Sequence, residues 1–320
     1  MFRIVLAICF PLFTLAQTWD TLKTTNECTA RGESALAVVK GKIYLLGSRG
    51  IRPVDALDLN NLTWTALQKP PIELHHFQAV TYKNEIWVLG GLTGNYPHEL
   101  PVDHIYIFNP SQNQWREGAS LPNDRLRGSA GVTVYKNKIY LVSGIQDGHW
   151  DGHTPWLDEY NPKTNQWTKL ADAPHARDHI SVQVINNKLY VAGGRRTTAK
   201  TNNVINLKEP AVDIYDFKYN TWTTLPEASN IPTMRAGASA VAYKDQLILL
   251  GGESDTQVPA HSEVEALDTK SNRWKKLANL HRGRHGTGAV IIKNKIYIVG
   301  GAGNRGGGPE LSSAEMLKLN

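Results

Sequence analysis

Apolar and polar residues alternate along this chain in short blocks, without the spacing that long helices show. The stretch from Arg125 to Gly144, RLRGSAGVTVYKNKIYLVSG, contains two apolar runs joined by the polar pair Lys136-Asn137. A polar pair between two apolar runs is typical of the two-residue turn of a β-hairpin. Close copies run from Arg235 to Gly252 and from Arg284 to Gly301. The pattern therefore predicts β-hairpins that recur along the chain.

Each hairpin belongs to a longer repeat, in which a Gly pair, a variable loop, a third strand and a Trp follow the hairpin. Six Gly pairs or variants mark six repeats: Gly47-Ser48, Gly90-Gly91, Ser143-Gly144, Gly193-Gly194, Gly251-Gly252 and Gly300-Gly301. Five repeats have the Trp, at Trp64, Trp115, Trp167, Trp222 and Trp274. The sixth lacks it, but Trp19 stands near the other end of the chain. We predict that the strand around Trp19 completes the sixth unit and closes a ring.

This spacing of Gly pairs and Trp residues resembles the kelch repeat, and the resemblance covers essentially all of the chain after residue 16. It implies an all-β fold, namely a six-bladed β-propeller of the galactose oxidase/kelch superfamily. Four-stranded blades are expected, with the first strand of each blade lining a central channel. Residues 17–320 are expected to form this one domain.

Residues 1–16 are predicted to be a secretory signal peptide. Arg3 precedes an apolar run from Ile4 to Leu15, and Ala16 offers a small residue for cleavage. The run is too short for a stable membrane-spanning helix. Lipoprotein processing at Cys9 is the less favoured alternative, because it leaves a very short apolar region. Without the signal, Cys28 is the one remaining cysteine, so we expect no internal disulfide. We also expect no integral membrane segment after removal of the signal, and a periplasmic or secreted monomer.

The formal net charge of +6 is modest, and no basic run or basic patch with aromatic residues is present. This argues against a nucleic-acid partner. The chain has no nucleophile motif and no phosphate-binding glycine loop, so no cofactor is expected. His149 and His153 with Asp151 are a weak metal pattern, because no helix aligns the two imidazoles. We therefore expect no metal ion.

Alignment of the repeats places an Arg at the start of the first strand in five of six: Arg31, Arg127, Arg177, Arg235 and Arg284. Leu74 occupies this position in the second repeat. Strand direction places the column and the variable loops on one face of the propeller, the upper face. Converging guanidinium groups predict a site for carboxylate, sulfate or phosphate. The alternative is structural, since five repeats have an acid near the top of the third strand: Asp55, Asp158, Asp213, Glu265 and Glu315.

Histidines accompany this column. His75 and His76 follow Leu74, and His179 and His285 lie within two residues of an Arg of the column. These four are candidates for acid–base catalysis. Tyr96, His98 and Glu99 of the blade-2 loop are candidates to meet His75 and His76 across the rim. Trp150 lies outside the structural Trp positions and is a candidate for stacking on a sugar or a partner.

Exported kelch proteins without a further domain resemble the bacterial periplasmic N-acetylneuraminate mutarotases (epimerases), which are six-bladed propellers acting on a carboxylated sugar. This resemblance implies an isomerase that binds an acidic sugar such as sialic acid at the upper face. One alternative is a non-catalytic module that binds a glycan or an acidic peptide segment. Another is a lyase or hydrolase acting on an anionic polysaccharide. The predicted partner is thus an anionic small molecule, a glycan or an acidic peptide.

Overall fold

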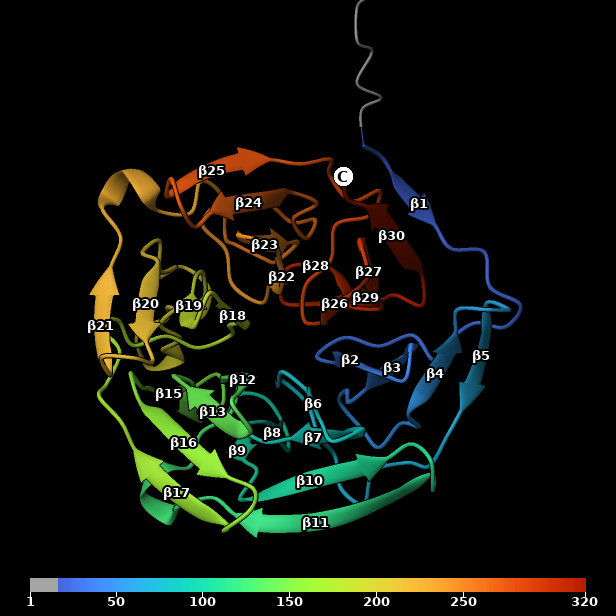
Figure 1. Cartoon of the computed structure of the whole chain (residues 1–320), viewed down its shortest axis with the longest axis horizontal. Coiled ribbons are helices and arrows are strands. Elements are labelled where there is room, and N and C mark those ends of the chain that lie inside the picture. Colours follow the sequence, from blue (N-terminus) through green and yellow to red (C-terminus); the bar gives the residue numbers. More distant parts are fainter. Residues whose placement is uncertain (1–16) are drawn as a thin grey trace, which may run out of the picture.

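The computed structural model describes residues 17–320, which form six four-stranded antiparallel sheets around a central axis (Figure 1). This confirms the predicted all-β, six-bladed propeller. The predicted signal peptide, residues 1–16, lies outside the described residues. Among residues 17–320, the structure contains no helix that is both long enough and apolar enough to span a membrane.

Each blade runs from an inner strand at the channel to an outer strand at the rim. In this order, blades 1 to 3 consist of β2 (Ala35–Val39), β3 (Lys42–Leu46), β4 (Asp55–Asp58), β5 (Thr63–Ala66); β6 (Val80–Tyr82), β7 (Glu85–Val88), β10 (His104–Asn109), β11 (Gln114–Ser120); and β12 (Gly131–Tyr135), β13 (Lys138–Val142), β16 (Leu157–Asn161), β17 (Gln166–Lys169). Blades 4 to 6 consist of β18 (Val182–Ile185), β19 (Lys188–Val191), β20 (Asp213–Asp216), β21 (Thr221–Thr224); β22 (Ser239–Tyr243), β23 (Gln246–Leu250), β24 (Val264–Asp268), β25 (Arg273–Lys276); and β26 (Ala289–Ile292), β27 (Lys295–Val299), β30 (Ala314–Lys318), β1 (Trp19–Thr21).

Short elements decorate the loops. Three two-stranded ribbons are β8 (Leu92–Thr93) with β9 (Leu100–Pro101), β14 (Ile145–Asp147) with β15 (Asp151–His153), and β28 (Ala302–Asn304) with β29 (Gly307–Glu310). Each ribbon begins directly after the Gly pair of its blade, so the variable loops and the ribbons stand on the same face. Three single-turn 3-10 helices lie at Asn123–Arg125, Ala199–Thr201 and Glu227–Ser229.

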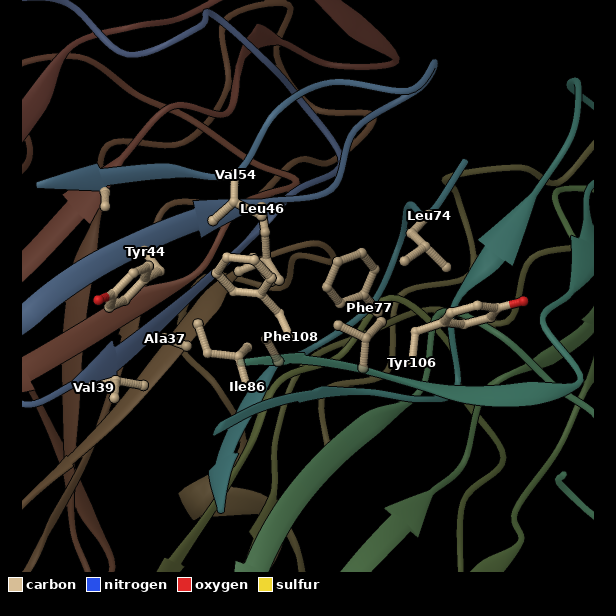
Figure 2. Close-up of a cluster of buried hydrophobic side chains, with 14 of the residues drawn as sticks. Ala37, Val39, Tyr44, Leu46, Val54, Leu74, Phe77, Ile86, Tyr106 and Phe108 are labelled. Atoms are coloured by element: carbon tan, nitrogen blue, oxygen red, sulfur yellow. The ribbon is translucent and has the colours of Figure 1, made fainter. Parts of the chain in front are cut away.

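The inner strands of neighbouring blades contact one another around the ring. They enclose a central channel of about 350 Å³, lined mostly by small and apolar residues of these six strands. The hydrophobic core lies between blades, because each blade presents one face to each neighbour. Figure 2 shows the cluster between blades 1 and 2, in which Leu46 and Val54 face Phe77, Ile86 and Phe108.

Trp19 closes the ring as predicted. β1 pairs antiparallel with β30, with Trp19 opposite Leu317, so the two ends of the chain share blade 6. The indole is 2% exposed, and its Nε1 donates a hydrogen bond to the Ala278 carbonyl at 2.8 Å. Trp115, Trp167, Trp222 and Trp274 likewise donate to a carbonyl about one repeat earlier. The repeated Trp therefore joins each of these blades to the preceding one.

Candidate functional site

The five arginines of the column lie inside the blades. All are 0–1% exposed, and each forms an ion pair with the acid of its own blade: Arg31–Asp55, Arg127–Asp158, Arg177–Asp213, Arg235–Glu265 and Arg284–Glu315. We call these pairs the arginine spokes. In blade 4, Arg177 also donates to the carbonyl oxygens of Gly193 and Ala211 at 3.0 and 2.9 Å. Because the guanidinium groups bond within their own blades and are shielded from solvent, the geometry assigns them a structural role instead of the predicted ligand contact.

Blade 2 has no spoke. By strand register, Tyr106 opposite Val88 occupies the position that Asp55 opposite Leu45 holds in blade 1. Leu74 and Tyr106 both belong to the apolar cluster shown in Figure 2. One blade thus replaces an ion pair with an apolar contact at the same place in the fold.

Two residues after each spoke position, the chain turns into the left-handed region. The six residues there have φ between 49° and 62°: Glu33, His76, Ser129, His179, Gly237 and Gly286. We call them the axial ring. Backbone hydrogen bonds run around it, since the N–H of Ser129 donates to the carbonyl of His76 and the N–H of His179 to that of Ser129, at 2.9 and 3.0 Å. All six residues line a narrow passage of about 40 Å³ at the upper end of the channel.

Four members of the axial ring are not glycine, although a left-handed residue with a Cβ atom costs roughly 1–2 kcal/mol. The same conformation occurs at hairpin turns such as Lys83-Asn84 and Lys136-Asn137, so the side chains that the turn presents, and not the turn itself, distinguish the axial ring. The strained turn lets Glu33, His76 and His179 line the mouth of the channel. This points to the mouth, and not to the arginine spokes, as the candidate functional site.

Three imidazoles meet at this mouth. His76 and His179 belong to the axial ring, and His149 comes from the turn between β14 and β15. Their ring centroids are 4.9–5.1 Å apart with interplanar angles of 65–78°. One ring nitrogen of each residue lies within 4.8 Å of one from each of the other two. We call His76, His149 and His179 the histidine trio.

Each imidazole of the trio contacts a carboxylate. His76 Nε2 lies 3.0 Å from Glu33, His149 Nδ1 lies 2.6 Å from Glu99, and His179 Nδ1 lies 2.5 Å from Asp178. Burial lowers the pKa of His179, and it lowers the pKa of His76 well below its usual range, together with repulsion from neighbouring imidazoles and Arg49. The two rings are therefore neutral near pH 7 and retain a lone pair.

The carboxylate of Glu99 is held in its ionised form. Burial alone raises its pKa, but the hydrogen bond from His149 and the charge and hydrogen bond of Arg49 lower the pKa of Glu99 to about 2. An ionised carboxylate accepts a hydrogen bond from the Nδ1–H of His149, which leaves the lone pair of that ring on Nε2. No residue of 17–320 donates a hydrogen bond to this Nε2. His149 is thus prepared to accept a proton or bind a ligand.

A pocket of about 400 Å³ opens above the trio. Its lining combines His76, His149 and His285 with Arg49, Arg195, Glu33, Glu253 and Glu310, and with the apolar or aromatic residues Tyr96, Val204 and Ile205. Arg49 forms an ion pair with Glu99, and Arg195 with Glu253. Arg195 Nη2 also donates to His179 Nε2 at 2.9 Å. The pocket therefore has a polar floor and a partly apolar wall.

The predicted residues divide between this pocket and its surroundings. His76 and His285 line it, and His179 belongs to the trio. His75 lies behind His76, with their Nδ1 atoms 2.6 Å apart. Glu99 lies beside His75 and His76, with ligand atoms of the three within 4.8 Å of one another, and Tyr96 lines the pocket together with His76, as expected. His98 instead contacts Asp147 and is not part of the pocket lining, so this part of the expectation is wrong. Trp150 packs on His98, with centroids 4.7 Å apart, and is not part of the pocket lining.

Sequence reasoning missed His149 as a partner of His76 and His179, and it missed Arg49, Arg195 and Glu253. A signal for the last three exists, because each directly follows a Gly pair. The backbone of Arg195 forms an isolated β-bridge with Asp178, and that of Glu253 forms one with Ala236. Asp178 and Ala236 each directly follow a spoke arginine. The position after the Gly pair is therefore a second column, whose residues line the pocket in blades 1, 4, 5 and 6: Arg49, Arg195, Glu253 and Ala302. His149 belongs to no column, since it lies in a variable loop.

Comparison with known proteins places this architecture in a family. The KLHDC2/KLHL20/DRC7 kelch-repeats domain matches residues 77–301. The chain belongs to the kelch-repeat family. It is similar to Kelch-like protein terF of Aspergillus terreus, with 30% identity over 311 residues that cover 88% of this chain and 64% of that protein. It is also similar to human Kelch-like protein 38, with 29% identity over 238 residues, 74% of this chain and 37% of that protein.

This kelch chain therefore spans less than two thirds of the length of these relatives. Among solved structures, YjhT is similar, with a TM-score of 0.75, 18% identity, and coverage of 91% of this chain and 95% of that one. At this identity the likeness shows the shared propeller fold.

Proposed function

We propose that this kelch propeller is a small-molecule enzyme whose upper pocket binds a sugar-sized polar molecule and whose histidine trio moves protons on it. The observation that carries the proposal is the His149–Glu99 pair, with an Nδ1 to carboxylate distance of 2.6 Å and an Nε2 lone pair free at the pocket floor. A histidine oriented by a carboxylate in this way is a common general base.

More specifically, we propose that the reaction is the mutarotation or epimerisation of an acidic sugar such as sialic acid. Ring opening of a sugar needs a base at the anomeric hydroxyl and an acid at the ring oxygen. His149 would take the first proton on its Nε2 and, as the imidazolium, return it to the ring oxygen. Arg49 replaces the spoke arginines as the carboxylate contact, because its side chain is 38% exposed and lines the pocket. The three pocket carboxylates Glu33, Glu253 and Glu310 require the substrate's carboxylate to point toward Arg49 and away from them.

Exchange NMR between the anomers of N-acetylneuraminic acid, and of neutral and other acidic sugars, tests this proposal. The wild type is expected to accelerate exchange, His149→Gln to lower the rate about 100-fold or more, and Arg49→Ala to affect acidic sugars more than neutral ones. Trp150→Ala is the matched control, since Trp150 lies outside the pocket lining, and it is expected to keep the wild-type rate. No acceleration with any sugar would rule out the isomerase form.

A non-catalytic protein-binding role is the second candidate, and the rim of the upper face favours it. Ile51, Tyr96, Leu100 and Val258 are large apolar or aromatic residues of the upper loops with 48–64% exposure. Exposed apolar residues beside a concave site are typical of docking surfaces. Hydrogen exchange of these loops, measured with and without an acidic peptide, tests this role. Slower exchange in the presence of the peptide, together with no conversion of any sugar, would favour it.

Export through the signal peptide and a monomeric state are part of the proposal. The mature chain is expected to begin at Gln17, which N-terminal sequencing of the protein recovered outside the cytoplasm checks. Light scattering is expected to give the mass of one chain. A retained Met1 would contradict the export prediction.

A further inference from the structure

Hydrogen bonding fixes the position of the lone pair on two imidazoles of the trio. His149 donates from Nδ1 to Glu99, because a carboxylate only accepts, so its lone pair is on Nε2. His179 accepts at Nε2 from Arg195, because a guanidinium only donates, so its Nδ1–H faces Asp178. Both rings therefore present an Nε2 lone pair at the channel mouth.

A row of contacts determines which ring nitrogen of His76 carries the proton. The carbonyl of Gly94 accepts from His75 Nε2 at 3.2 Å, so a neutral His75 has its lone pair on Nδ1. His76 must then donate from its Nδ1 across the 2.6 Å contact with that atom. This leaves His76 Nε2 with a lone pair facing a Glu33 oxygen at 3.0 Å. Two acceptors at this distance repel one another unless they share a proton or a metal cation.

We propose that His76, His149 and His179 bind one divalent transition-metal ion of the Zn²⁺ type, with Glu33 next to it. One ring nitrogen of each imidazole lies within 4.8 Å of one from each of the other two. A tetrahedral zinc site with Zn–N bonds of about 2.0–2.1 Å places its nitrogens about 3.3 Å apart. Closing this difference requires the side chains to rotate and His179 to give up its contact with Arg195. Three imidazoles with a nearby carboxylate suit zinc and its neighbours better than calcium or magnesium.

The surroundings of the trio match those of metal-binding histidines. In such sites, the ring nitrogen remote from the metal usually donates to a carboxylate, which fixes the ring and raises its basicity. Glu99 holds His149 in this way, and Asp178 holds His179. The fourth position of the metal would face the pocket, because His76 and His149 line its floor.

Arg195 limits the affinity of this site. Its guanidinium group lies 2.9 Å from His179 Nε2, so a metal ion must displace it. Arg195 then retains Thr197 and Glu253 as partners. Because breaking this contact opposes metal binding, we expect micromolar affinity instead of the tighter binding of a structural zinc site.

The inference does not require the proposed function, because metal binding is measured without any substrate. If both hold, the ion would lower the pKa of a bound water, and the hydroxide formed by loss of a proton from that water to solvent would take the place of the free imidazole as the proton acceptor. Sugar conversion that persists in a chelator-treated, metal-free protein would support the proposed function and leave no role for the metal. Metal binding without sugar conversion would support the metal site alone.

Calorimetric titration with Zn²⁺ tests the site, on protein purified without a polyhistidine tag and treated with chelator. The wild type is expected to bind one ion per chain. His149→Gln and Glu99→Gln are each expected to weaken binding 10- to 100-fold. His98→Gln is the matched control, because His98 is an exposed histidine that contacts Asp147, outside the trio, and it is expected to bind as the wild type does.

Binding only at millimolar Zn²⁺, or equal affinity of the wild type and His149→Gln, would overturn the inference. Thermal unfolding establishes that each variant is folded before it is titrated. The visible spectrum of Co²⁺ in the wild type gives a readout that needs no variant. A strong tetrahedral-type band supports the site, whereas the spectrum of the hydrated ion contradicts it.

Discussion

In the five blades that have an arginine spoke, the arginine and the axial-ring residue are only two positions apart, yet they have different roles. A spoke arginine bonds to an acid and to carbonyl groups of its own blade and is shielded from solvent. The axial-ring residue turns left-handed and lines the mouth of the channel. A buried charge that is satisfied locally stabilises one blade. A polar group whose partners come from other blades marks the place where chemistry is possible.

The partners of the mouth residues show this contrast. His76 of blade 2 contacts Glu33 of blade 1, and Arg195 of the blade-4 loop pairs with Glu253 of the blade-5 loop. These contacts exist only when the ring is assembled. Both partners of a spoke, by contrast, belong to a single blade. We expect substitutions at the two positions to separate stability from function.

The largest effect is expected from Arg235→Leu. The substitution leaves the Glu265 carboxylate buried and without its cation, although the Thr233 hydroxyl still donates to it. Breaking a buried ion pair by removal of one partner costs about 3–5 kcal/mol. Urea unfolding monitored by Trp fluorescence measures the loss. Arg273→Leu on the outer strand of the same blade is the control and should change stability by less than about 0.5 kcal/mol.

The double variant Arg235→Leu/Glu265→Tyr copies the apolar pair of blade 2 into blade 5. It removes both charges, and a buried ion pair replaced by apolar residues of similar volume is often neutral in stability. We expect it to regain at least half of the stability that Arg235→Leu loses. A double variant less stable than the single one would show that blade 2 needs further adaptations to do without a spoke.

A smaller, pH-dependent effect is expected at Glu253, beside Arg195 and His285 in the pocket. Burial raises its pKa, but His285, Arg195 and the Gly306 N–H together hold the pKa of Glu253 well below 4.5. A carboxylate with a lowered pKa in the folded protein adds stability at pH values above its ordinary pKa. This added stability is lost progressively as the pH falls from the ordinary pKa toward the lowered one. Glu253→Gln is expected to cost about 2 kcal/mol at pH 7. The difference from the wild type should shrink in unfolding measured from pH 5 to pH 2, and a constant difference would contradict the assignment.

The smallest effect is expected within the axial ring, from Gly237→Ala. A Cβ atom at Gly237 meets nothing closer than 3.6 Å, so the cost is that of the left-handed backbone, φ +62°. This is about 1 kcal/mol. Ser129→Gly, at φ 51°, should be neutral or slightly stabilising. Thermal unfolding measures this cost. A loss of stability above about 3 kcal/mol for Gly237→Ala would show that the added Cβ atom clashes with its neighbours, in addition to the cost of the left-handed backbone.

Repetition made most of the fold predictable. Six Gly pairs and the repeated Trp set the number of blades, and the missing sixth Trp predicted closure through Trp19. The candidate site was only partly predictable. His76, His179 and His285 were found because they stand near a register position that recurs in every repeat of this chain, whereas His149 lies in a variable loop whose sequence is not repeated in the other blades.

The sequence by itself determined the propeller, the direction of its strands and the face that carries the variable loops, because these depend on local hydrophobic spacing repeated six times. Only the tertiary structure decided which charged residues are structural and which face the pocket. Arg177 and Asp178 are neighbours in the chain, yet one bonds inside blade 4 and the other supports the trio through His179. Local spacing cannot distinguish them, because the left-handed turn after the spoke and the contact of the blade-3 ribbon with blades 2 and 4 arise only when the ring closes.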